Sequence, residues 1–302
     1  MENFIYDYYG YKIDKIVNNK FYYQGYTFLL FAISDSEEQI KQLESLINKL
    51  STSFNNDVVY IVKNKYKKYI STENNNNNIC LLAYKDNDVN INQFVYLHVN
   101  FYNHFNYKVK INDIIILWDQ RLEYIQNQCL VGLNFDNESH LILYEHCQYA
   151  IGLALNSLQY LSDINIDFQA TLYDCTINHR RIKKMDKLEL FNPFNLILDH
   201  SSRDLAELYK NDLISISDLI NICKYYNYRL DEYEYLLARI LYPTFIFDII
   251  EDIATDPTFY DNNYQIYEAI NKQNKQINKI KQLYNSLNNL MSIRPIEWIN
   301  EI

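Results

Sequence analysis

Glycine and proline are scarce in this chain, which has only four of each among its 302 residues. Average proteins contain several times more of both. Two common phosphate-binding loops depend on closely spaced glycines, and the chain contains neither the GxGxxG pattern nor the GxxxxGKS/T pattern. The sequence therefore excludes nucleotide-binding loops of these two kinds.

Positive charge and long apolar runs are also in short supply. The chain has 28 Lys and Arg against 38 Asp and Glu, which gives a net charge of −10 and a pI of about 5.1. We expect no nucleic-acid partner, because phosphate backbones bind basic surfaces.

No apolar run reaches the roughly 18 to 20 residues of a membrane span. The N-terminus MENFIYDYYGYKID has no basic and apolar leader. We expect a protein made in the cytoplasm, without a membrane partner.

The cysteines are few, widely spaced and odd in number: Cys80, Cys129, Cys147, Cys175 and Cys223. Disulfide frameworks need an even set of cysteines, and structural zinc sites need short CxxC spacings. Neither pattern occurs in this chain. The sequence predicts five buried, reduced thiols.

Residues 1–86 predict a small sheet with one helix, within a chain whose 48% hydrophobic content is ample for a core. Two or three strands with a turn near Asn18 and Asn19 are predicted within 11–33, and more strands at 58–62, 67–71 and 79–84. The segment SDSEE (34–38) is typical of a helix start, with Ser34 or Asp35 as the N-cap.

Helical periodicity dominates from residue 112 to the C-terminus. An amphipathic helix is predicted over 112–125, and a nearly apolar one over 139–161 must be buried. Strand signals interrupt the helices at 170–178 and 194–199. The remaining helices are predicted at 203–211, at 215–226, at 230–253 with a break or kink at Pro243, and at 259–290.

Four segments carry a resemblance to a known family. They are WDQRLEYI (118–125), EHCQYAIGLALNSLQYLSD (145–163), TINHRRI (176–182) and LILDHSSRDLAELY (196–209). In this order they resemble the spore coat kinase-like proteins of the CotS and YutH type, within the choline kinase and aminoglycoside phosphotransferase group. The resemblance implies an α+β, bilobal protein-kinase-like fold. It would have a small β-rich N-lobe with one helix (1–86), a hinge or linker (87–111) and a larger, mainly helical C-lobe (112–302).

The catalytic loop that the resemblance implies is degenerate. Active phosphotransferases of this group have a His-Gly-Asp loop, whose Asp orients the attacking hydroxyl or accepts its proton. His179 matches the loop histidine, but Arg180 and Arg181 follow it. A guanidinium cannot accept a proton, so Arg181 cannot replace the catalytic acid.

The metal-binding positions match the family only in part. The group places an Asn five residues after the catalytic Asp, and a later Asp at the end of a strand; both hold magnesium against the nucleotide phosphates. Five residues after Arg181 this chain has Asp186, so Asn192 or Asn195 would have to replace the Asn. Asp199 matches the later Asp. The resemblance therefore implies Asp199 and Asn195 as the residues that would bind nucleotide and metal.

Several residues of these segments also have a structural interpretation. His179 is expected to brace loops by hydrogen bonding rather than to catalyse. His200, beside Asp199, is expected to lie on a polar rim. Arg203 and Asp204 begin the next helix, where Asp204 suits the positive end of the helix dipole. We expect both of them to hold the local structure together.

The lysine that holds the phosphates in kinases is missing from the expected strand. The segment FLLFAIS (28–34) contains no Lys or Arg. The helix that follows offers glutamates without that lysine as a partner: Glu37, Glu38 and Glu44. A lysine relocated to an earlier strand, Lys12 or Lys20, is the remaining alternative.

These changes predict a catalytically impaired kinase-like protein, a pseudokinase, with a structural or interaction role. No cofactor is expected. The resemblance implies protein partners, including other spore coat proteins, and a location in the spore coat if the organism sporulates. The alternative is an active small-molecule phosphotransferase that uses ATP and magnesium, with Asp186 as a displaced acid. A third possibility is a nucleotide-sensing protein that binds without turnover.

Overall fold

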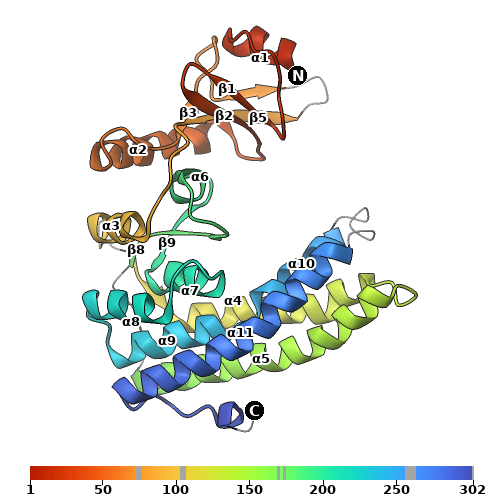
Figure 1. Cartoon of the computed structure of the whole chain (residues 1–302), viewed down its shortest axis with the longest axis vertical. Helices are drawn as coiled ribbons and strands as arrows, with labels where there is room; N and C mark the ends of the chain where they lie inside the picture. The colour runs from red at the N-terminus through yellow and green to blue at the C-terminus, as the bar shows by residue number, and fades with distance from the viewer. Residues whose placement is uncertain (73–76, 103–106, 169–170, 173–174, 256–262, 301–302) are drawn as a thin grey trace. The chain divides into compact units, whose positions relative to one another are not determined.

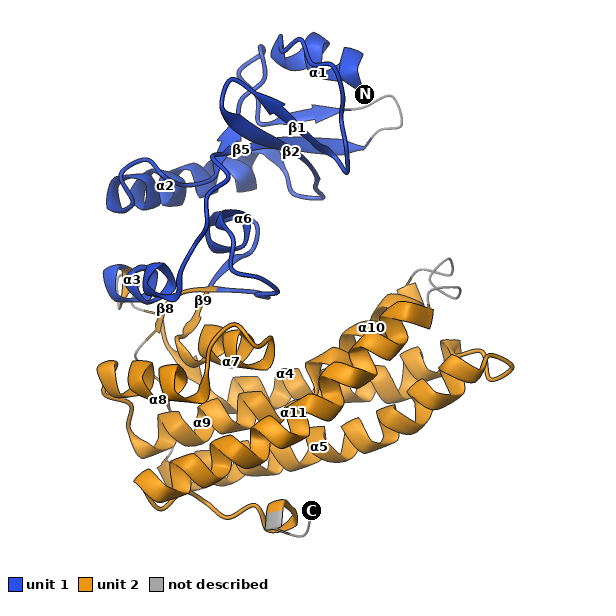
Figure 2. Cartoon of the chain, in the orientation of Figure 1, with its two compact units in different colours: residues 1–100, 179–197 blue, residues 101–178, 198–302 orange. Residues whose placement is uncertain are grey.

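The computed structural model describes residues 1–72, 77–102, 107–168, 171–172, 175–255 and 263–300. The chain forms two compact units, drawn in blue and orange in Figure 2. The first, here called the sheet unit, contains residues 1–100 and 179–197. The second, the helical unit, contains residues 101–178 and 198–302. The sheet unit is thus completed by a segment from the second half of the chain. The lobe boundaries at 86 and 111 stay a prediction, because compact units alone do not define lobes.

The sheet unit is built on five antiparallel strands in the order β1-β2-β5-β3, with β4 also pairing to β5 (Figure 1). Their bounds are Lys20–Tyr23 (β1), Tyr26–Ala32 (β2), Tyr60–Val62 (β3), Ile70–Thr72 (β4) and Asn78–Tyr84 (β5). The predicted strands are therefore confirmed. The predicted turn is confirmed, because Asn18 and Asn19 lie between Val17 and Lys20, whose main chains exchange two hydrogen bonds of 2.9 Å. A second turn, formed by Gln24 and Gly25, connects β1 to β2. Asn18 and Asn19 precede β1, with φ values of 50° and 60°.

The two faces of this sheet pack against different partners. The helix α2 (Glu37–Ser53) contributes Ile40 to a cluster with Cys80 on one face. The helix α1 (Glu2–Tyr9), which the sequence did not predict, contributes Ile5 to an aromatic cluster on the other face. Because side chains alternate along a strand, Phe28 and Leu30 of β2 point toward this second cluster.

The N-cap of α2 is Ser36, so the prediction of Ser34 or Asp35 is wrong. The Ser36 hydroxyl accepts a hydrogen bond from the Gln39 amide, and the Gln39 side chain accepts one from the Ser36 amide. This reciprocal pair satisfies two amides that a helix start leaves unpaired. Two further helices lie in or beside this unit: α3 (Ile91–Phe101), inside the predicted linker, and α6 (Lys187–Phe191).

The helical unit is built around the long helix α5 (Glu138–Phe168), which contacts α4, α9, α10 and α11 (Figure 1). Its helices are α4 (Ile111–Tyr124), α7 (Ser202–Lys210), α8 (Ile216–Tyr225), α9 (Leu230–Leu241), α10 (Thr244–Thr255) and α11 (Asn263–Leu290). Shorter helical segments are the π-helix η1 (Ile125–Cys129) and the 3-10 helices η2 (Leu130–Gly132) and η4 (Glu297–Asn300). The predicted helices are confirmed, including the break at Pro243 between α9 and α10. The predicted start of the last helix at 259 lies outside the described residues.

Two small sheets complete the architecture. The strands β6 (Val109–Lys110) and β7 (Thr171–Leu172) form one pair, and β8 (Cys175–His179) and β9 (Leu196–His200) form the other. They confirm the strand signals that interrupt the predicted helices. All five cysteines are buried and free, as predicted.

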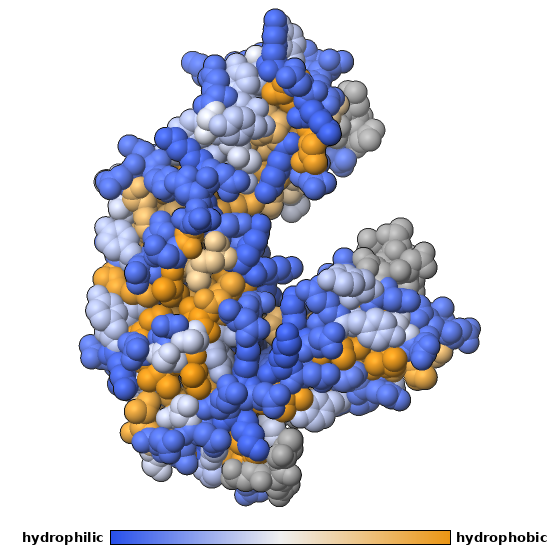
Figure 3. Space-filling view, viewed as in Figure 1, coloured by the Kyte–Doolittle hydropathy of each residue, from blue (hydrophilic) through white to orange (hydrophobic). Residues whose placement is uncertain are grey.

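Apolar residues are not confined to the interior. On the face drawn in Figure 3, hydrophobic residues in orange form patches separated by hydrophilic residues in blue. Among the helices of the described segments, none combines the length and the hydropathy that crossing a membrane requires.

Candidate functional site

Asp199, near the end of β9, is a buried carboxylate held by two arginines. Its Oδ2 accepts hydrogen bonds from Arg203 Nη1 at 3.0 Å and from Arg239 Nη2 at 2.8 Å. Its Oδ1 accepts one from the His200 amide at 2.7 Å. Burial opposes the ionisation of Asp199, but the charges of Arg239 and Arg203 outweigh it and hold the pKa of Asp199 below its ordinary value. Asp199 is therefore an ionised carboxylate with both oxygens in use.

Arg239 supplies the deeper of these two charges. It lies on α9 with 8% of its surface exposed, and its Nη2 also donates to the Tyr235 hydroxyl at 2.6 Å. Its guanidinium lies 4.8 Å from the centre of the Tyr235 ring and 5.9 Å from that of Trp118. The sequence interpretation did not include Arg239. The sequence does contain a sign of this residue, because Arg239 is the single charged residue in the apolar run LLARILYP. A buried arginine in such a run needs a buried acid as its partner.

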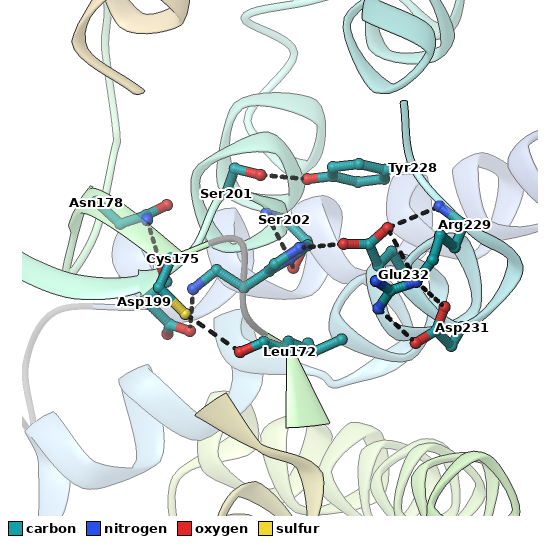
Figure 4. Close-up of polar contacts among 11 residues, drawn as sticks. Leu172, Cys175, Asn178, Asp199, Ser201, Ser202, Tyr228, Arg229, Asp231 and Glu232 are labelled. Carbon is teal, nitrogen blue, oxygen red and sulfur yellow. Dashed lines mark hydrogen bonds and ion pairs between the residues drawn. The ribbon is translucent and has the colours of Figure 1, made fainter. Parts of the chain in front are cut away.

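His200 is fully buried, so its prediction as a polar rim residue is wrong. Its Nδ1 accepts a hydrogen bond from the Ser202 amide at 3.3 Å, which leaves the proton on Nε2. That nitrogen lies 3.1 Å from Oε1 of Glu232, at the start of α9. The other oxygen of Glu232 accepts from the Arg229 amide at 2.7 Å, as Figure 4 shows. His200 and Glu232 thus connect the strand end to α9.

Glu232 stays ionised although it is buried. Burial favours the protonated form of this carboxyl, but the hydrogen bonds from His200 and from the Arg229 amide, together with the nearby charge of Arg229, outweigh burial and lower the pKa of Glu232 below its ordinary value. Beside this pair, the Ser201 and Tyr228 hydroxyls are 2.6 Å apart (Figure 4). The polar groups around the end of β9 therefore interact mainly with one another.

Asn178, on β8, ties β9 to the start of α7. Its Nδ2 donates to the main-chain oxygen of Asp199 at 2.8 Å, and its Oδ1 accepts from the Asp204 amide at 3.3 Å. Asp204 is fully buried. The sequence interpretation did not single out Asn178, because an Asn in a strand carries no local signal of its partners.

His179 lies at the end of β8 with no exposed surface. Its Nε2 is 3.0 Å from the main-chain oxygen of Leu190 in α6, and its ring centre is 5.5 Å from that of Phe94. These contacts link three segments of the sheet unit. They fit the predicted bracing role of this histidine.

Asn195 forms hydrogen bonds with the loop that follows His179. Its Nδ2 donates to the Arg181 main-chain oxygen at 2.8 Å, and its Oδ1 accepts from the Arg181 amide at 3.3 Å. The Arg180 amide donates to the main-chain oxygen of Asn195 at 2.8 Å. The Arg181 side chain donates to the Arg180 main-chain oxygen at 3.3 Å. Asn195 thus pins the position of Arg181.

Asp186 caps α6. Its Oδ1 accepts from the Glu189 amide at 2.8 Å, and its Oδ2 lies 2.5 Å from Lys184 Nζ. Asp186 and Asn195 belong to the sheet unit, whereas Asp199 belongs to the helical unit. Within the segments that the structure describes, no three His, Cys, Asp or Glu side chains are grouped as a metal site would require.

Phe31, on the strand that was expected to carry the phosphate lysine, forms an aromatic pair with Phe194, which lies in the turn before β9. Phe31 of β2 alternates with Phe28 and Leu30, so it points to the face that α2 covers. Its ring stacks on that of Phe194, with centres 5.0 Å apart and planes 11° apart.

The helix glutamates have partners of their own. Glu37 accepts from the amides of Tyr69 at 2.6 Å and Ile70 at 3.0 Å. Glu44 pairs at 2.9 Å with Lys63, which follows β3. The segment 28–34 offers these glutamates no lysine, and the lysine that pairs with Glu44 comes from beyond β3 instead.

A family model described as "Spore coat putative kinase YutH" matches residues 2–287. The chain belongs to this family. A comparison with curated proteins gives no match. The family assignment confirms the resemblance that the four sequence segments suggested.

Solved structures confirm the α+β, kinase-like fold. An aminoglycoside phosphotransferase from Alicyclobacillus acidocaldarius is similar with a TM-score of 0.54 and 12% identity, over 91% of this chain and 93% of that chain. A spectinomycin phosphotransferase in complex with ADP and spectinomycin has a TM-score of 0.52 and 12% identity, over 91% and 92%. At this identity the likeness concerns the fold alone.

Proposed function

We propose that this protein is a catalytically impaired, kinase-like member of its family with a structural or interaction role in the spore coat. The observation that carries the proposal is the pairing of Asp199 with Arg203 and Arg239, at 3.0 and 2.8 Å. In phosphotransferases of this fold, an Asp at this position would hold magnesium. Here its charge is already balanced within the protein.

The residues around Asp199 do not fit a magnesium ion. Mg²⁺ needs oxygen ligands in a tight octahedron, and guanidinium groups supply only N–H donors. A cation at Oδ2 would have to displace Arg239, which is 8% exposed and has Asp199 as its charge partner. Removing the partner of a buried charge is strongly unfavourable. The pairing therefore favours a protein that works without ATP and magnesium.

The other expected positions support the same proposal. Arg181 occupies the position of the proton acceptor, and both ends of the Asn195 amide bond to its main chain. Phe31 and Phe194 stack where β2 lacks a lysine. Phosphoryl transfer depends mostly on positioning and charge stabilisation, so these changes together would remove most of the rate.

Nucleotide binding and turnover test the proposal directly. ATP with magnesium would be titrated into the full chain by calorimetry and in thermal unfolding, with an active aminoglycoside phosphotransferase as the positive control. We expect no heat of binding and no rise in Tm, because a ligand of the native state must raise Tm by mass action. Magnesium-dependent stabilisation by ATP, lost in both Asp199→Asn and Asn195→Ala, would contradict the proposal; phosphate release would favour the active alternative over binding without turnover.

A second experiment tests the role in the coat. A fluorescent fusion of the full chain would be followed in sporulating cells, with Arg181→Ala as a companion variant. We expect both proteins at the forming coat, since Arg181 has no catalytic task in this proposal, and we expect coat proteins among those that co-purify. Diffuse fluorescence throughout the mother cell would argue against a coat role.

A further inference from the structure

The sheet unit contains a cavity of about 710 Å³ that is separate from the candidate site. Its apolar floor includes Phe28, Val62 and Ala83, which belong to the cluster on the sheet face opposite α2. Ligand sites in proteins have volumes of about 300 to 1,000 Å³. The cavity is therefore large enough for a small molecule.

Aromatic rings form one side of this cavity. The lining includes Tyr11, Tyr23, Tyr26 and Phe28. The Tyr11 ring centre is 5.0 Å from that of Tyr23 and 5.1 Å from that of Phe28, with planes tilted by 37° and 52°. These rings pack against one another at tilted angles, and they do not form two parallel surfaces with a gap between them. Within the described part of the chain, the Tyr11 and Tyr26 hydroxyls have no hydrogen-bond partner, so both remain available to a ligand.

Neutral amides supply part of the polar lining. They are Gln24, Asn55, Asn56 and Asn87. Each side-chain amide has both donors and acceptors, as a hydroxyl group does. Gln24, Asn55 and Asn56 are held in turns with positive φ values of 47°, 52° and 62°. The turns therefore fix the backbone positions from which these three side chains extend.

The cavity carries almost no net charge. Its two charged residues are Asp57 and Lys85. Asp57 pairs with Lys187, whose side chain is 1% exposed. The Lys85 amine lies 5.6 Å from the centre of the Tyr26 ring. Because Lys187 already balances Asp57, a single amine remains, and it does not match a phosphate chain or a multivalent cation, so the cavity fits a neutral ligand.

We propose that this cavity binds a neutral oligosaccharide. A sugar ring has an apolar face of C–H groups and an edge of hydroxyl groups. The electron-rich face of an aromatic ring attracts the C–H face, and the amides match the hydroxyl edge. A flat nucleobase stacks best between two parallel surfaces, which the tilted wall of Tyr11, Tyr23 and Phe28 does not provide. The assignment is independent of whether Asp199 binds a metal.

Maltotriose, cellotriose and the trimer of N-acetylglucosamine are suitable probes, with adenosine for comparison. Saturation-transfer NMR and calorimetry on the full chain are expected to show at least one sugar binding with a Kd of about 1 mM or tighter. Tyr23→Ala is expected to weaken binding about tenfold or more, and Gln24→Ala to weaken it as well. Tyr22→Ala is the matched control, because Tyr22 is on the same strand, is 71% exposed and does not line the cavity.

The possible results separate clearly. Binding that is lost in Tyr23→Ala and Gln24→Ala but kept in Tyr22→Ala supports the proposal. Co-sedimentation with insoluble cellulose or chitin would then identify a polymer as the source of the sugar, and binding of the trisaccharide alone would identify a free sugar. The proposal is wrong if no sugar binds, if adenosine alone binds, or if Tyr22→Ala weakens binding as much as Tyr23→Ala.

Discussion

Arg239 donates to Oδ2 of Asp199 at 2.8 Å, although the two residues are 40 positions apart in the chain. Both are nearly withdrawn from solvent, with 8% and 4% of their surfaces exposed. Neither charge is stable there alone, because an unpaired buried charge has lost its hydration without compensation. The pair therefore joins β9 to α9.

Removing the charge of Asp199 is expected to destabilise the protein. Asp199→Asn leaves Arg239 and Arg203 without their anion, and breaking a buried pair in this way costs about 3 to 5 kcal/mol. Urea unfolding of the variant measures the loss. Glu268→Gln is the control, since its pair with Lys272 is about half exposed and is expected to contribute about 1 kcal/mol or less. Equal effects of the two variants would contradict the prediction.

The same carboxylate predicts how stability depends on pH. The pKa of Asp199 is lower in the folded protein than its ordinary value, so the folded state binds fewer protons than the unfolded state in this range. Its contribution is complete above the unfolded pKa of about 3.9 and is lost as the pH falls through the folded pKa. Urea midpoints measured from neutral to acidic pH should fall less steeply in Asp199→Asn than in the unaltered chain. If the urea midpoints of both proteins fall equally with pH, a group other than Asp199 dominates the loss of stability in acid.

The pair of His200 and Glu232 gives a third prediction. Glu232→Ala leaves the buried ring N–H of His200 without its acceptor, and a lost partner of this kind lowers the free energy of unfolding by about 1 to 3 kcal/mol. Glu232→Gln keeps an acceptor oxygen and should lose less. Asp163→Ala, which removes an exposed partner of Gln159, should change stability by about 0.5 kcal/mol or less. A Glu232→Gln variant as unstable as Glu232→Ala would mean that the charge, and not the hydrogen bond, matters.

The thiols should be inert in the native protein. Burial raises the pKa of Cys80 and of Cys147 to about 12, and it also raises that of Cys223. The thiolate is the reactive form, so a thiol reagent at neutral pH should not modify these cysteines until the chain unfolds. Counting the modified thiols by mass spectrometry, with and without denaturant, tests this. Rapid modification of Cys80 or Cys147 in the native protein would contradict it.

Local signals allowed most helices and strands to be predicted. Pro243 cannot continue a helix, and it separates α9 from α10 as expected. The helix α1 was missed because its segment ENFIYDYY is rich in aromatic residues, which favour strands. It forms because Ile5 is buried against the sheet, a contact that the segment itself does not encode.

Only part of the candidate site was predictable from the sequence, and its pairings were not. The family segments identified Asp199 and His179 by their motif positions, whereas Asn195 was one of two asparagines that could replace the residue whose position Asp186 occupies. They gave no sign that His200 would be buried against Glu232, or that Asn195 would bond to the main chain of Arg181. Such partners are set by how elements pack, and side-chain hydrogen bonds leave no periodic trace in a sequence.

The sequence by itself determined the family, the order of most helices and strands, and the arginine at position 181 where the resembled group has an Asp, because composition, periodicity and motif positions are local properties. Only the tertiary structure determined which charged groups contact Asp199. Whether a carboxylate at a strand end holds a metal or balances an arginine depends on which charges lie within about 4 Å of it. For Asp199 that charge comes from Arg239, which folding brings from a distant helix.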